Sequence, residues 1–179
     1  MTSSRLSIVG LALALTAPVA VCAAQSQFVY HVGGGGTMPS GDLGTYANTG
    51  WNGFAGIGKA MASNPNLFLQ ATAFYAHVSH DGTSGEATNI PGVGVGALYR
   101  LGTGNVHPYV SGQVGFLQHR YDAGTSEYAY GSESETKGFL GVGGGLAVNR
   151  VFVDVRYVAA SGTSFIPISI GVTLGGLKK

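Results

Sequence analysis

The stretch AHVSHDG at 76–82 contains residue types that nucleophilic catalysis uses. His77 and Ser79 are two positions apart, so on a β-strand both would lie on the same face. A nucleophilic serine needs a base within hydrogen-bond reach, and the base needs a third group to orient it. Asp81 and Glu86 follow nearby. Because His-x-Ser is a common spacing, His77 and Ser79 are only weak candidates for a catalytic pair.

The other potential ligands do not form a recognisable metal or cofactor site. The remaining histidines have no metal-ligand spacing with one another, and the aspartates that open the polar breaks lack a complete calcium-loop pattern. These residues are His31, His107 and His119, and Asp42, Asp81 and Asp122. We therefore predict no metal and no cofactor.

The segment VFVDVRYV at 151–158 places two charges in an apolar strand. Since successive strand side chains alternate between faces, Asp154 and Arg156 share the face opposite the valines. Arg100 and Lys137 fall on the equivalent face of their own segments. Because buried charges need partners, we predict a network that links Asp154 to Arg156, Arg100 or Lys137. A structural role is the main interpretation of this network, and a proton or ion relay is the alternative.

Strands must position these groups, because no amphipathic helix pattern follows residue 25. Instead, segments of about ten residues alternate with period two and are separated by polar, Gly-rich breaks. Eight such segments are predicted, at 27–37, 49–60, 67–78, 91–101, 107–120, 137–148, 151–158 and 165–174.

One face of most segments is Val, Ile, Leu and Tyr, whereas the other mixes Gly, Ser, Thr, Gln and isolated charges. Only 9% of residues are charged, although a water-facing sheet would carry many Lys and Glu. A charge on a lipid-facing strand surface costs roughly 2–4 kcal/mol at the membrane centre. The sequence therefore predicts an all-β, eight-stranded, antiparallel up-and-down transmembrane β-barrel. The formal net charge of +1 gives no indication of a nucleic-acid partner.

Small and aromatic residues fit a narrow barrel. Glycines are expected to make space in the lumen for large side chains: Gly94, Gly96, Gly143 and Gly145 for Tyr109, Phe139, Phe152 and Phe165. Aromatic residues near predicted strand ends are typical of the girdles found at both membrane interfaces. The predicted girdle comprises Phe28, Tyr30, Trp51, Tyr75, Tyr99, Tyr109 and Tyr157.

The breaks alternate in length, as the two ends of an up-and-down barrel require. The long breaks are 38–48, 79–90, 121–136 and 159–164, and the short ones are 61–66, 102–106 and 149–150. The long breaks are predicted to be surface loops that could meet ligands.

The N-terminal segment has the layout of a secretory signal peptide. One cation, Arg5, precedes an apolar run and then small residues. We expect residues 1–24 to be cleaved, which leaves residues 25–179 as a single barrel domain. Cys22 is the only cysteine and falls within the cleaved part.

Four stretches, HPYVSGQVGF at 107–116, KGFLGVGGGLAV at 137–148, VFVDVRYV at 151–158 and FIPISIGVTLG at 165–175, carry a resemblance to a known family. The chain resembles the small outer-membrane β-barrel family of opacity-like and outer-membrane-protein-A-like domains. The resemblance implies a location in the outer membrane of a Gram-negative-type bacterium, with periplasmic termini and four surface loops. It also implies outer-membrane lipid and the barrel assembly machinery as partners.

Three functions remain open from the sequence. The first is a structural or surface-interaction protein without an open pore. The second is a carrier of small or apolar molecules across the outer membrane. The third is a lipid-modifying enzyme, because His77 and Ser79 are similar to the His-x-Ser pair of lipid A deacylases, although the surrounding residues do not match that family.

Overall fold

The computed structural model describes residues 28–80, 86–102, 104–122 and 134–175. The predicted signal peptide with Cys22, and segments 81–85 and 123–133 of two predicted loops, lie outside the described residues. Among the described residues, no helix is long and apolar enough to cross a membrane.

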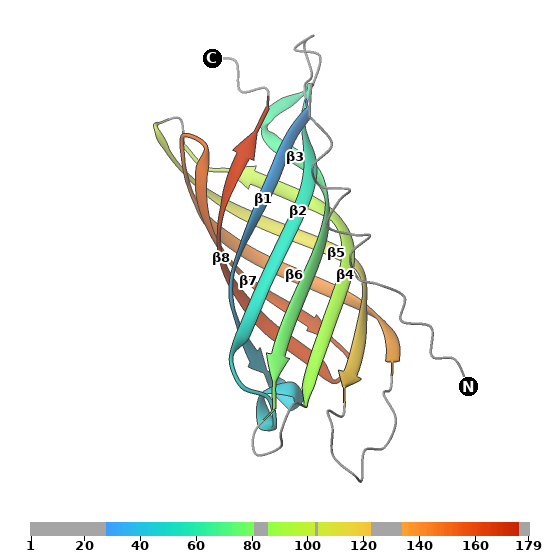
Figure 1. The fold of residues 1–179 in the computed structure, drawn as a ribbon. Helices are drawn as coiled ribbons and strands as arrows, with labels where there is room; N and C mark the ends of the chain where they lie inside the picture. The colour runs from blue at the N-terminus through green and yellow to red at the C-terminus, as the bar shows by residue number, and fades with distance from the viewer. Residues whose placement is uncertain (1–27, 81–85, 103, 123–133, 176–179) are drawn as a thin grey trace, which may run out of the picture.

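Eight antiparallel strands close into a barrel, in which each strand pairs with its neighbour in sequence and the first pairs with the last (Figure 1). The predicted architecture is therefore confirmed. The strands are β1 (Phe28–Ser40), β2 (Gly50–Met61), β3 (Asn64–Ser79), β4 (Ala87–Arg100), β5 (Val106–Asp122), β6 (Ser134–Val148), β7 (Val151–Ala160) and β8 (Thr163–Leu174).

The two ends of the barrel differ. The connections β2–β3, β4–β5 and β6–β7 are short turns at one end, which we call the turn end. The connections β1–β2, β3–β4, β5–β6 and β7–β8 lie at the other end, which we call the loop end and which is at the bottom of Figure 1. A short 3-10 helix, η2 (Gly41–Thr45), lies in the first loop-end connection.

Several strands run further than predicted. β3 already begins at Asn64, and β4 and β6 begin inside the predicted loops, at Ala87 and Ser134. The predicted long loop at 159–164 is wrong, because β7 ends at Ala160 and β8 begins at Thr163. A two-residue turn suffices there because Gly162 adopts a positive φ of 64°.

The outer surface is the aliphatic face that the alternation predicted. Val95, Val114, Leu140 and Ile170 lie on four different strands and are each more than half exposed. In water such a continuous apolar belt would be costly, whereas in lipid it is the favoured surface.

The loop end of the lumen is filled by an apolar cluster. Phe74 packs edge-on against Phe139, with ring centroids 5.5 Å apart, and against Phe165 at 6.3 Å. Leu43 of η2 is completely buried against this cluster, so the first connection packs onto its loop-end side. We call the cluster the apolar plug; its buried members are Leu43, Ala76, Val78, Ile90, Leu117, Phe139, Val158 and Phe165.

Two of the four predicted glycines leave room for predicted aromatic residues. A Cβ at Gly94 would lie 2.9 Å from the ring of Phe139, and one at Gly145 would lie 2.6 Å from the Tyr109 hydroxyl. The prediction is wrong for the other two, since a Cβ at Gly96 would first meet the backbone of Gly112 and Gln113, and one at Gly143 that of Val155 and Arg156. At these two positions glycine allows neighbouring strands to approach closely.

Candidate functional site

Midway along the lumen, a buried ion pair joins β7 to its neighbours. Arg156 Nη2 lies 3.1 Å from Asp154 Oδ1. The Tyr109 hydroxyl donates to Asp154 Oδ2 at 3.0 Å, and Arg156 Nη1 donates to Gln113 Oε1 at 3.0 Å. Asp154 is only 5% exposed, so its charge depends on these partners.

The register explains why Tyr109 reaches the carboxylate. Arg100, Tyr109, Gly145 and Asp154 are direct neighbours across β4, β5, β6 and β7. Since Gly145 has no side chain, the ring of Tyr109 can lie over β6 and place its hydroxyl beside Asp154. Tyr109 therefore occupies the space through which Arg100 would have to reach.

The charge network is smaller than predicted. The guanidinium of Arg100 lies over the ring of Phe68, 4.3 Å from its centroid, instead of pairing with Asp154. Lys137 pairs with the exposed Glu135, from Nζ to Oε2 at 3.1 Å. The structure thus brings together Asp154 and Arg156, and it separates Arg100 and Lys137 from them.

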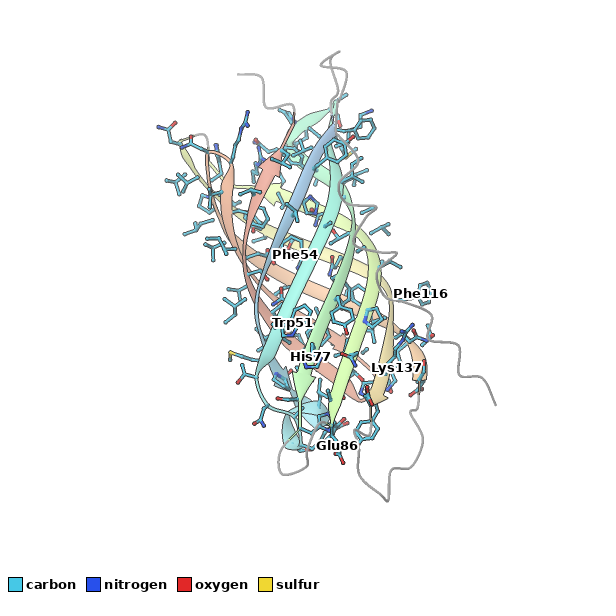
Figure 2. All side chains as sticks on the ribbon, viewed as in Figure 1. Trp51, Phe54, His77, Glu86, Phe116 and Lys137 are labelled. Atoms are coloured by element: carbon cyan, nitrogen blue, oxygen red, sulfur yellow. The ribbon has the colours of Figure 1, made fainter. Side chains whose placement is uncertain are left out.

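The described residues line two small cavities inside the barrel. One, of about 70 Å³, lies toward the turn end and is lined in part by Arg100 and Thr173. The other, of about 30 Å³, lies toward the loop end. Phe54, Asp154 and Arg156 border both cavities, so these three side chains lie between them; we call the three residues the partition. Phe54 stands near mid-height of the barrel in Figure 2.

The weak catalytic candidates lie on the outer face near the loop end. His77 Nδ1 is 2.8 Å from Asn89 Oδ1, and the His77 ring stacks on Trp51 at 5.8 Å. Ser79 is exposed, and in the described part of the chain no hydrogen bond joins it to His77. Among the described residues, Ser79 thus has no hydrogen-bonded base of the kind that activates a nucleophilic serine. Asp81 lies outside the described residues.

Six of the seven aromatic residues predicted for the girdle are exposed on the outer face. Three of them, Phe28, Tyr30 and Tyr99, lie near the turn end. The other three, Trp51, Tyr75 and Tyr157, lie toward the loop end. The placement of Tyr109 in the girdle is wrong, because its side chain is 6% exposed and points into the lumen. Its position in β5 has the same parity as the inward Gln113, which decides its face.

The described histidines do not gather around a metal. No group of three or more His, Cys, Asp or Glu side chains that could hold a metal ion occurs in the described ranges. His31 in the lumen lies 3.3 Å, from Nε2, from the hydroxyl of Thr72. The side chains that contact His31 are thus a hydroxyl and the Phe54 ring, neither of which is a typical metal ligand.

His80 belongs to a small cluster beyond the end of β3. Its Nε2 lies 2.8 Å from Thr88 Oγ1, and its ring packs against Tyr46 and Tyr121 at 5.2 and 5.3 Å. Burial lowers the pKa of His80 below its usual value, and the nearby Glu86 opposes part of this effect. The neutral imidazole is thus the form that fits the folded loop end.

Sequence reasoning missed the polar residues that surround His77 on the outer face. Asn89 accepts a hydrogen bond from the Tyr75 hydroxyl at 2.7 Å in addition to its contact with His77. On the next strand, Arg120 Nε donates to Gln118 Oε1 at 2.6 Å. No short motif links these positions, because the strand register alone brings them together.

A closed eight-stranded barrel with an apolar outer belt and a side-chain-filled lumen is the fold of small outer-membrane proteins. Among solved structures, the chain is similar to Neisserial surface protein A, with a TM-score of 0.61 and 19% identity over 83% of this chain and 97% of that one. It is also similar to the attachment invasion locus protein Ail of Yersinia pestis, solved with the heparin analogue sucrose octasulfate (TM-score 0.51, 13% identity, 82% and 99% covered).

The outer membrane protein OprG from Pseudomonas aeruginosa is a further similar structure, with a TM-score of 0.50 and 11% identity over 83% of this chain and 96% of that one. No protein-family model and no curated protein sequence matches the chain. At these identities the similarity establishes the fold.

Proposed function

We propose that this protein is an integral outer-membrane barrel with a closed lumen, and that its role is structural or lies in interactions at the cell surface. In this proposal the cleaved signal peptide exports the chain, the barrel assembly machinery inserts it, and the loop end faces the exterior. The connections that could meet a partner are those around 38–48, 79–90 and 121–136, since the two-residue turn at 161–162 is too short to project.

The partition by Phe54, Asp154 and Arg156 is the observation that carries the proposal. It divides the lumen into cavities of about 70 and 30 Å³, which have room for a few water molecules. The apolar plug then fills the loop end, where Leu43 is fully buried. A solute would have to displace both a charge pair and a packed core in order to pass.

Planar-bilayer conductance tests the closed lumen. The folded full-length mature protein should give no discrete conductance steps, whereas a large porin in the same bilayers should give regular ones. The shift in electrophoretic mobility on heating checks that the inserted barrel is folded. Reproducible steps from folded wild-type protein would contradict the proposal and would favour transport.

A further inference from the structure

Five side chains form a continuous row around part of the outer face, near the loop end. Trp51 pairs with His77 across β2 and β3, His77 with Asn89, Asn89 with Arg120, and Arg120 with Ser134. We call these residues the outer row. Figure 2 shows Trp51 and His77 close together in the loop-end half of the barrel.

The outer row lies where the apolar belt ends. On β5 the outward residues run from Val114 and Phe116, which are 54% and 65% exposed, to Gln118 and Arg120. The change from aliphatic and aromatic to polar side chains marks the boundary between lipid chains and headgroups. Arg120 is thus at headgroup level and is directly in line with the belt beneath it.

Hydrogen bonds hold the polar side chains of the row in place. Gln118 accepts from Arg120 Nε at 2.6 Å and donates to the Ser134 hydroxyl, also at 2.6 Å. Within the described residues, the two terminal amino groups of Arg120 have no hydrogen-bond partner, and Arg120 makes no salt bridge. Asp122, two residues toward the loop end on the same face, is the nearest acidic group on this strand.

We propose that the outer row binds the anionic phosphomonoester headgroup of a lipid in the leaflet at the loop end. A guanidinium whose Nε is already fixed presents its remaining N–H groups as a fork, which suits two phosphate oxygens. The acyl chains of the same lipid would lie along Phe116 and Val114. This continuity with the belt favours a membrane lipid over a soluble anion. This proposal rests on the part of the proposed function that places the barrel in the outer membrane. It does not require the loop-end connections to bind a partner.

Quenching by brominated lipids measures which lipid occupies this position. Trp51 is the only tryptophan, so the pair Trp51→Phe and Phe116→Trp moves the single fluorophore onto the expected path of the acyl chain. Both changes keep an aromatic ring at each position and leave Arg120, which makes the proposed phosphate contact, in place. In phosphatidylcholine vesicles, brominated phosphatidic acid should quench this fluorophore with about five-fold higher apparent affinity than brominated phosphatidylcholine. This is the preference expected for one arginine at an anionic surface.

Arg120→Gln in the same background should reduce the preference to less than two-fold. Arg150→Gln, in the turn at the opposite end, is the matched control and should retain it. Raising the salt concentration should weaken the preference of the unmutated row, since Arg120 is exposed. Equal quenching by both lipids, or a preference that survives Arg120→Gln in folded protein, would overturn the proposal. Loss of the preference on adding inorganic phosphate at constant ionic strength would also overturn it, because the site would then select a soluble anion.

Discussion

Replacing Asp154 with alanine should destabilise the barrel by about 3 kcal/mol. Removing one partner of a buried ion pair typically costs 3–5 kcal/mol, because the other charge remains uncompensated. We expect the lower limit of that range for two reasons. Arg156 keeps its hydrogen bond to Gln113, and it borders two cavities that can admit water. Tyr109 loses the carboxylate but keeps a 3.2 Å hydrogen bond to the Val153 carbonyl.

The double variant Asp154→Ala with Arg156→Met is the decisive comparison. It removes both charges, so no uncompensated guanidinium remains, although Tyr109 and Gln113 each lose a hydrogen bond to a charged group. Because the cost of burying the two charges is removed as well and offsets much of this loss, the double variant should lie within about 2 kcal/mol of the wild type. It should therefore be more stable than Asp154→Ala alone, although it carries one more substitution.

Urea unfolding and refolding in lipid vesicles, followed by Trp51 fluorescence, gives the free energies. The heat-dependent shift in mobility confirms which samples are folded. The reasoning is refuted if Asp154→Ala unfolds at the same urea concentration as the wild type. It is equally refuted if the free-energy changes of the single variants Asp154→Ala and Arg156→Met add up to that of the double variant. Additive effects would mean that the two charges do not interact.

Three further predictions use the same unfolding assay or a titration. Gly145→Ala should cost about 1–3 kcal/mol through overpacking against Tyr109, whereas Gly112→Ala, where a Cβ would meet nothing within 4 Å, should be nearly neutral. Leu43→Ala should cost about 2–3 kcal/mol because the side chain is fully buried in the apolar plug. The imidazole of His80 should titrate by NMR below the usual histidine range, because burial lowers its pKa. Since that pKa is lower in the folded than in the unfolded chain, the contribution of His80 to stability is present above about pH 6.5 and is lost as the pH falls through the folded pKa.

Alternation was sufficient to predict the barrel, because facing in or out is a local property of a strand. The outward Val95 and the inward Asp154 could both be assigned from their immediate neighbours in sequence. The turn at Ser161 and Gly162 was missed because its length depends on pairing between two strands and is not a local property. Polar residues beside it suggested a long loop, but Ala159 and Ala160 on one side and Thr163 and Ser164 on the other pair directly across β7 and β8.

Partners across the barrel could not be predicted, because they depend on register and on depth. Arg100 has the right charge and the right face for Asp154, yet Tyr109 stands between them in the same cross-strand row. The outer row has the same origin: Asn89 and Arg120 are more than thirty positions apart in sequence and become neighbours only when β4 and β5 pair. Alternation gives the face of a side chain, whereas closure of the barrel determines what that side chain touches.

Two different arrangements of side chains fill the lumen, and they respond differently to substitution. At mid-depth the partition depends on electrostatic pairing around Asp154 and Arg156, while at the loop end the apolar plug depends on close packing around Leu43. Neutralising the ion pair leaves the packed residues of the plug in place, so the double variant that lacks both charges should remain non-conducting. In the closed barrel that we propose, each arrangement blocks the path independently, so stability can be changed at one without opening the other. An internal charge pair in so narrow a barrel is therefore better explained as a means of making a filled polar lumen stable than as a gate.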